Sequence, residues 1–97
     1  MTEQQTMTEQ QLRAWSALSR AASRVGADAH REQLAAHLKR GRARSTYRYF
    51  PTEGHRELVS TLAELGRGRI TAEEAMSALH YGEGAASLER ARMRAAR

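Results

Sequence analysis

The side chains of this 97-residue chain that are candidates for catalysis, metal binding or ligand binding are histidines, carboxylates and a run of basic and aromatic residues. The histidines stand at positions 30, 37, 55 and 80, and the closest pair is two helical turns apart, too far to chelate one metal ion. Glu73 and Glu74 point in different directions on a helix, so they do not form an acid and base pair. The chain has no cysteine, which excludes disulfides, thiolate nucleophiles and sulfur-ligated metals. We therefore expect no catalytic residue, no metal, no cofactor and no enzymatic activity.

Basic residues are concentrated at positions 39–49, which contain five of them and no acidic residue. Residues 50–89 have an acidic excess, and the last eight residues are basic again. Guanidinium groups pair with phosphates, and Tyr47, Tyr49 and Phe50 adjoin the block, a combination suited to nucleic acid. Two alternatives stay open. Arginines near a helix end can simply offset the helix dipole, and the aromatic rings can supply core, which is our preferred interpretation for Phe50.

A helix, a turn and a second helix are predicted around this block. The first helix contains Gln33-Leu34-Ala35-Ala36-His37-Leu38, and the second lies in Ser45-Thr46-Tyr47-Arg48-Tyr49-Phe50-Pro51. Residues 33–51 resemble the helix-turn-helix of tetracycline-repressor-type DNA-binding regulators, whose reading helix carries a Thr-x-Tyr-x-Tyr-Phe-Pro pattern. The turn Arg40-Gly41-Arg42-Ala43-Arg44 departs from the family's usual Ala-Gly-Val turn, and the family's long ligand-binding region is absent. The resemblance implies a helix-turn-helix, but it does not imply a small-molecule effector.

A reading helix here would bring short polar side chains and an arginine to the base edges, with further arginines on flanking phosphates. The candidate nucleic-acid-binding residues are Lys39, Arg40, Arg42, Arg44, Ser45, Thr46, Tyr47 and Arg48. Arg40-Gly41-Arg42 and Arg67-Gly68-Arg69 also match minor-groove hooks. Both tripeptides fall at expected helix ends, however, where glycine is common in any case.

The chain is expected to form one all-α domain, a small bundle of about five short helices that includes the helix-turn-helix-like unit. Capping boxes at Thr8 and Thr71 predict two helix starts, and Gly41 predicts a helix end. Gly26 is expected to end the first helix, and Asp28 to cap the second. The expected divisions are a mobile tail (1–7), a helical domain (8–84) with a turn at 81–84, and an Ala- and Arg-rich C-terminal helix or arm (85–97).

The apolar residues are mostly small, since the chain has eighteen alanines but only thirteen Leu, Ile, Val and Phe residues. This composition favours thin helices around a small core, and such a chain is expected to need a partner. The predicted apolar stripe of the first helix is Leu12, Trp15, Leu18, Ala22 and Val25, with Trp15 in the core.

Our leading hypothesis from the sequence is a small helical DNA-binding regulator or accessory protein, a homodimer that binds double-stranded DNA through residues 39–50. Its Arg and Ala bias is typical of high-GC bacterial or phage genomes. The alternative is a protein-interaction module, such as an antitoxin, an anti-defence protein or an assembly factor. It would dock on an acidic partner through its C-terminal helices, with Arg90, Arg92 and Arg94 as partner-binding residues. The sequence shows no bilayer-spanning stretch and no signal peptide, so a cytoplasmic location is expected.

Overall fold

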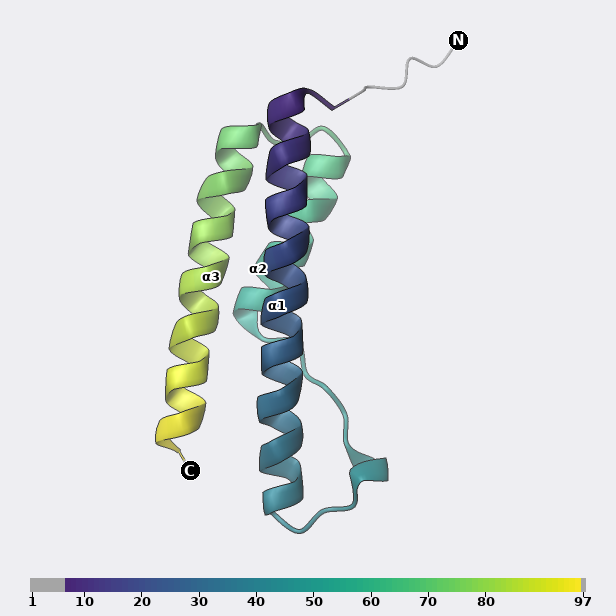
Figure 1. Cartoon of the computed structure of the whole chain (residues 1–97), viewed down its shortest axis with the longest axis vertical. Helices are drawn as coiled ribbons and strands as arrows, with labels where there is room; N and C mark the ends of the chain where they lie inside the picture. Colours follow the sequence, from purple (N-terminus) through teal and green to yellow (C-terminus); the bar gives the residue numbers. More distant parts are fainter. Residues whose placement is uncertain (1–6, 97) are drawn as a thin grey trace.

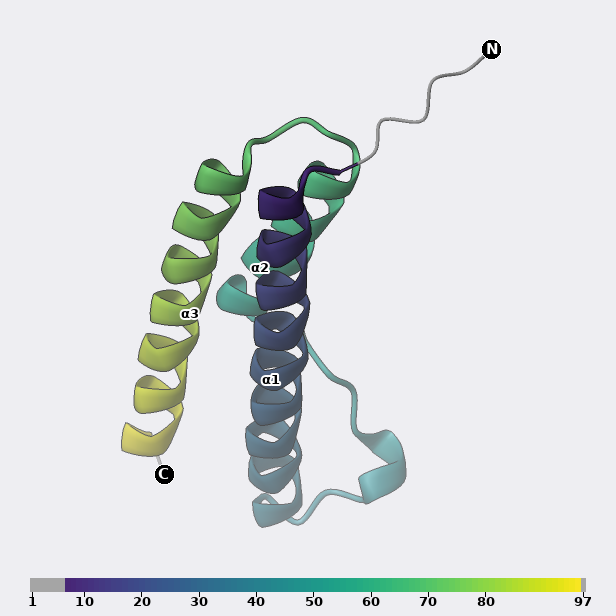
Figure 2. The same cartoon turned by 45° about the horizontal axis from the view of Figure 1, so that its top comes forward.

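Three α-helices lie side by side along one axis (Figure 1). The computed structural model describes residues 7–96. Helix α1 (Glu9–Lys39) leads into a loop with one short 3₁₀ turn, η1 (Arg44–Thr46). Helix α2 (Glu53–Gly66) then runs back along α1, and α3 (Ala72–Ala95) runs in the same direction as α1 (Figures 1 and 2). The all-α class is confirmed, but the expectation of about five short helices is wrong.

A single 31-residue helix, α1, replaces the two helices predicted on either side of Gly26. Gly26 lies within the helix, and a Cβ atom there would come within 2.9 Å of the His55 ring. This glycine therefore lets His55 of α2 pack closely against α1, and the contact offsets the helix penalty of about 1 kcal/mol for an internal glycine. Asp28 is not a cap, because it lies in mid-helix and pairs with Arg31 and Arg90.

The turn predicted at residues 81–84 is also absent, because α3 continues through it to Ala95. A Cβ atom on Gly82 would lie 2.8 Å from Leu58, and one on Gly54 would lie 2.7 Å from the Gly82 carbonyl oxygen. The glycines thus mark the place where α2 and α3 approach most closely, and they do not break the helix. The predicted C-terminal segment 85–97 forms the last turns of α3 as far as the structure describes it.

The predicted helix termini at Thr8, Gly41 and Thr71 are confirmed. The Thr8 hydroxyl accepts a hydrogen bond from the backbone N–H of Gln11, and the Thr71 hydroxyl accepts one from the backbone N–H of Glu74. In return, the side chains of Gln11 and Glu74 accept hydrogen bonds from the backbone N–H groups of Thr8 and Thr71. Gly41 has a φ of 77°, a left-handed conformation that ends α1 and that favours glycine. These signals depend only on residues close together in the chain.

The core is thin, as the alanine-rich composition predicts. Its largest fully buried side chains are Leu18, Leu58 and Leu65, one from α1 and two from α2. Alanines fill most of the remaining core and let the helices approach closely; the buried ones are Ala14, Ala21, Ala22, Ala29, Ala75 and Ala86. The predictions for three large residues are wrong, because Leu12 is 52% exposed, Trp15 is 37% exposed and Phe50 is 74% exposed.

The second helix of the expected helix-turn-helix is absent. Only η1 is helical in this part of the chain, and Tyr47 has an extended backbone. Pro51 disfavours a helical conformation for the residue before it, and the backbone N–H and C=O of Phe50 bind the side chain of Gln33 instead of helical neighbours. The predicted reading-helix residues therefore lie on a loop.

The predicted mobile tail, residues 1–7, lies outside the described residues except for Met7. Met7 is half-buried and packs against the core. Within residues 7–96, none of the helices is apolar over a length that could cross a membrane.

Candidate nucleic-acid interface

The segment from residue 39 to residue 50, which we call the basic loop, is held against the second half of α1. Three polar side chains at helical spacing on α1 face it: His30, Gln33 and His37. The amide of Gln33 donates to the Phe50 carbonyl oxygen at 2.8 Å and accepts from the Phe50 N–H at 2.9 Å. Nε2 of His37 donates to the Ala43 carbonyl oxygen at 2.8 Å. The loop is thus fixed near both of its ends.

Tyrosine and histidine rings hold the middle of the basic loop. The Tyr47 hydroxyl donates to the His30 carbonyl oxygen at 3.2 Å, and its ring contacts the rings of His30 and His37 edge to face. The Tyr49 hydroxyl lies 2.7 Å from Nδ1 of His55. Burial raises the pKa of both tyrosines above its ordinary value of 10.0, so at neutral pH the phenols are uncharged and do not reduce the positive charge of the loop.

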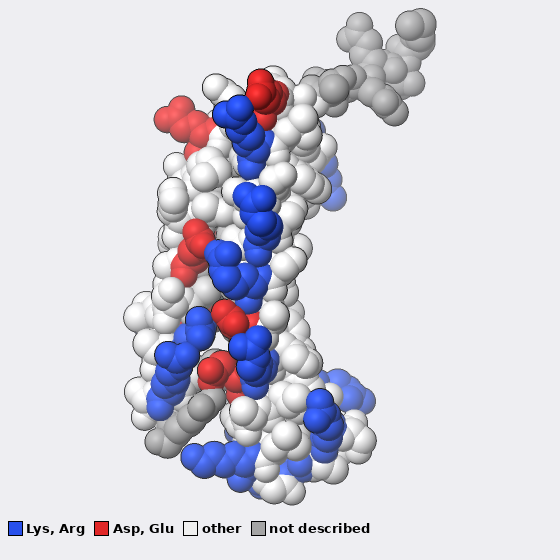
Figure 3. Space-filling view, in the orientation of Figure 1, with Lys and Arg blue, Asp and Glu red and all other residues white. Residues whose placement is uncertain are grey.

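In the part of the chain that the structure describes, the cations of the basic loop are not paired with carboxylates. Its five basic residues are all exposed, and none forms an ion pair within residues 7–96; they are Lys39, Arg40, Arg42, Arg44 and Arg48. Most arginines elsewhere in the described chain are paired with a carboxylate, at positions 13, 24, 31, 67, 69, 90 and 94. On the face in Figure 3, the lower end carries basic side chains with no acidic side chain among them. Most of the positive charge that has no carboxylate partner within the described residues therefore lies on the basic loop.

A groove of about 450 Å³ separates the basic loop from the C-terminal ends of α1 and α3. Its walls combine guanidinium groups, aromatic rings and polar groups of α1: Gln33, Ala36, His37, Arg40, Arg42, Thr46, Tyr47, Arg48, Phe50 and Met93. Five of the eight residues predicted to bind nucleic acid share this groove. Of the other three, Lys39 borders the neighbouring hollow beside Met93, whereas Arg44 and Ser45 lie on the exposed turn η1.

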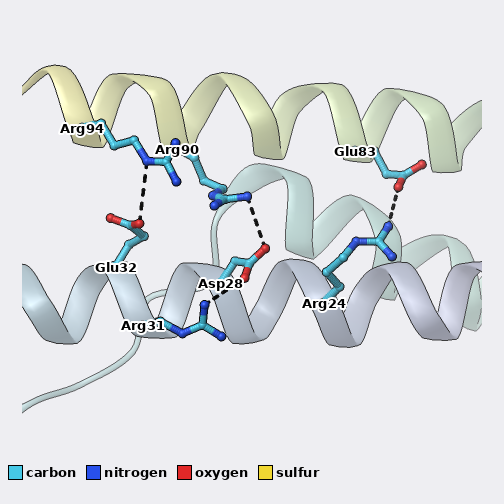
Figure 4. Close-up of polar contacts among 7 residues, drawn as sticks. All are labelled: Arg24, Asp28, Arg31, Glu32, Glu83, Arg90 and Arg94. Carbon is cyan, nitrogen blue, oxygen red and sulfur yellow. Dashed lines mark hydrogen bonds and ion pairs between the residues drawn. The ribbon is translucent and has the colours of Figure 1, made fainter.

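The three arginines predicted to bind a partner lie in two different surroundings. Arg90 pairs with Asp28 at 3.3 Å, and Arg94 pairs with Glu32 at 3.9 Å. Both ion pairs join α3 to α1, as Figure 4 shows. Arg92 instead borders a hollow on the outer face of α3. Arg90 and Arg94 thus stabilise the bundle itself.

Sequence reasoning missed four residues that build this site. His30 and His37 were considered only as metal ligands, but their spacing on one helix face was the available signal that they support a loop. Gln33 gave no distinct signal. Met93 reaches the groove only because α3 runs parallel to α1, so nothing near it in the sequence identified it.

The described residues contain no group of three or more histidines and carboxylates that could hold a metal ion. The chemistry of the groove is therefore that of cations, hydrogen-bond donors and aromatic faces. No protein family, curated protein or solved structure matches this chain.

Proposed function

We propose that this chain is a small nucleic-acid-binding regulator or accessory protein that contacts phosphates through the basic loop. The observation that carries the proposal is the set of five exposed cations without a carboxylate partner, in a protein whose other arginines are mostly paired. Guanidiniums without a carboxylate partner lose no internal ion pair when they bind phosphate. Arg48 also donates from Nη1 to the Ser45 and Tyr47 carbonyl oxygens, and its other donors can reach a phosphate.

The proposed contacts predict a strong salt dependence. Each neutralised phosphate releases condensed counterions, so five contacts give a slope of log K against log salt of about −3.5 for a single strand and −4.5 for a duplex. Because the described basic loop contains only the short turn η1 and no α-helix that could enter the major groove, this binding is expected to tolerate many sequences.

Binding is tested by fluorescence anisotropy of labelled oligonucleotides between about 50 and 200 mM salt. The variant is Arg40→Gln with Arg42→Gln, which removes two charges from the basic loop. The matched control is Arg67→Gln with Arg69→Gln, because Arg67-Gly68-Arg69 has the same spacing and a left-handed glycine, but lies at the turn between α2 and α3.

We expect the basic-loop variant to weaken binding and to reduce the salt slope by about 1.4 to 1.8, while the control leaves the slope unchanged. Absence of binding at about 50 mM salt contradicts the proposal. Equal effects of the two double variants also contradict it, because they would show that net charge matters and the basic loop does not.

A second candidate function, a protein-interaction module, is favoured by the outer face of α3. Tyr81 and Leu88 are 58% and 53% exposed and lie two turns apart, with Ala85 between them. Together with Arg92 they border a hollow of about 410 Å³. Exposed apolar residues on one helix face are typical of a protein contact.

Sedimentation equilibrium of the purified chain tests this candidate, with a second copy of the chain as the first partner examined. If α3 mediates pairing, the wild-type chain is a dimer and Leu88→Asp is a monomer. A wild-type monomer at all concentrations contradicts the homodimer expected from the sequence.

A further inference from the structure

Phe50, the single phenylalanine of this chain, is the most exposed large apolar residue within residues 7–96. The core lacks large side chains and has only three fully buried leucines, yet Phe50 lies outside it with 74% of its surface exposed. Leaving such a ring in water forgoes the stabilisation that burial would give. A ligand surface explains this placement better than the packing of the bundle does.

The Phe50 backbone is held in place on both sides. Its N–H and C=O groups both bind the Gln33 side chain, at 2.9 and 2.8 Å. The preceding residue, Tyr49, is anchored to His55, and the following Pro51 has a fixed φ. The ring therefore projects from a fixed backbone, and such preorganisation reduces the entropy lost on binding.

The groups around Phe50 suit a nucleotide. The ring shares the 450 Å³ groove with Tyr47 and with Arg40, Arg42 and Arg48, so that an aromatic face and three cations border the same space. Nucleobases stack on aromatic side chains, and the phosphates on either side of a base pair with guanidiniums. The groove volume is within the range of small-molecule sites.

The exposed ring favours a single strand over a duplex. In a duplex each base face is covered by its neighbours, whereas an unpaired base can turn out and stack on a protein ring. Within the described residues, the basic loop offers neither a helix nor a pair of strands to fit a major groove.

We propose that the basic loop binds single-stranded nucleic acid, with one base stacked on Phe50 and the adjoining phosphates held by Arg40, Arg42 and Arg48. This inference rests on the proposed nucleic-acid-binding function and deepens it. Stacking supplies the preference for unpaired bases, and the arginines supply the charge-dependent part of the affinity.

The experiment compares a labelled oligothymidine of about 15 nucleotides with the same strand annealed to its complement. The variants are Phe50→Ala, Phe50→Tyr and the control Leu12→Ala, which removes an exposed apolar side chain from the first turns of α1. Circular dichroism first establishes that all variants keep the helix content of the wild type.

A second readout reports stacking directly. Phe50→Trp is introduced into a Trp15→Phe background, so that the only tryptophan stands in the groove. Oligothymidine is expected to quench its fluorescence, whereas inorganic polyphosphate, which has phosphates but no bases, binds without this quenching.

We expect Phe50→Ala to weaken single-strand binding by roughly 5- to 150-fold, with Phe50→Tyr and Leu12→Ala close to wild type. If the basic-loop arginine variant loses binding but Phe50→Ala does not, stacking is refuted and the phosphate-binding function stands. Tighter binding to the duplex that depends on Phe50 also refutes the proposal, because the ring would then act as a wedge between base pairs. If neither oligonucleotide binds at about 50 mM salt, the proposed function itself fails.

Discussion

Replacing Gly54 by alanine tests whether α2 and α3 cross as closely as the structure indicates. The added Cβ atom would lie 2.7 Å from the Ala86 amide nitrogen and from the Gly82 carbonyl oxygen, about 0.7 Å short of ordinary contact. Both neighbours are backbone atoms, so the clash is relieved only by moving one helix away from the other. Gly84→Ala is the matched control, because a Cβ atom at Gly84 meets nothing within 4 Å.

The two substitutions should change the free energy of unfolding in opposite directions. Overpacking costs about 1 to 3 kcal/mol, and we take the upper half of this range at Gly54 because backbone must move. Alanine regains up to about 1 kcal/mol of helix propensity at each site. The expected net result is a loss of about 1 to 2 kcal/mol for Gly54→Ala and a gain of up to about 1 kcal/mol for Gly84→Ala.

Thermal unfolding followed by circular dichroism measures the difference. At about 4 to 8 °C per kcal/mol, the two midpoints should separate by roughly 10 to 20 °C, with the wild type between them. If both variants become more stable by similar amounts, the close crossing at Gly54 is wrong, and the glycines would then have no packing role.

Two further predictions concern the helix start at Thr71 and the anchor of the basic loop. Hydrogen bonds from Thr71 hold the pKa of Glu74 below its ordinary value of 4.5; the backbone N–H of Thr71 contributes most and its hydroxyl less. The ionised Glu74 side chain therefore stabilises the folded state fully above pH 4.5, and this contribution is lost as the pH falls through the lowered pKa. Glu74→Gln should therefore unfold with a weaker dependence on pH between about 5 and 2, and an unchanged dependence would contradict this. Gln33→Ala should release the Phe50 backbone and speed trypsin cleavage in the basic loop without changing helix content. The control is Gln10→Ala, at an exposed position of α1. Equal cleavage rates for the two variants would show that Gln33 does not anchor the loop.

The local features of this protein were predictable from its sequence. The caps at Thr8 and Thr71 and the helix end at Gly41 follow from bonds between residues a few positions apart, so a short window contains all the partners. The all-α class follows from alanine content and apolar spacing. The charge of the basic loop is likewise a property of consecutive residues.

The candidate site itself needed contacts between distant residues. The sequence pattern favoured a helix at Ser45–Phe50, but Gln33 on α1 competes for the Phe50 backbone from 17 positions away. Arg90, a residue predicted to bind a partner, pairs within the bundle with Asp28, 62 positions away. Predictions that consider only neighbouring positions in the sequence cannot identify these partners.

Helix starts, the thin core and the clustering of positive charge follow from residue types and their near neighbours, so all three are legible in the amino-acid sequence. The roles of Gly26 and Gly82, which permit close contacts instead of ending helices, depend on how the helices pack, and so does the position of Phe50 outside the core. A glycine's helix penalty is small, about 1 kcal/mol, and contacts with another helix can outweigh it.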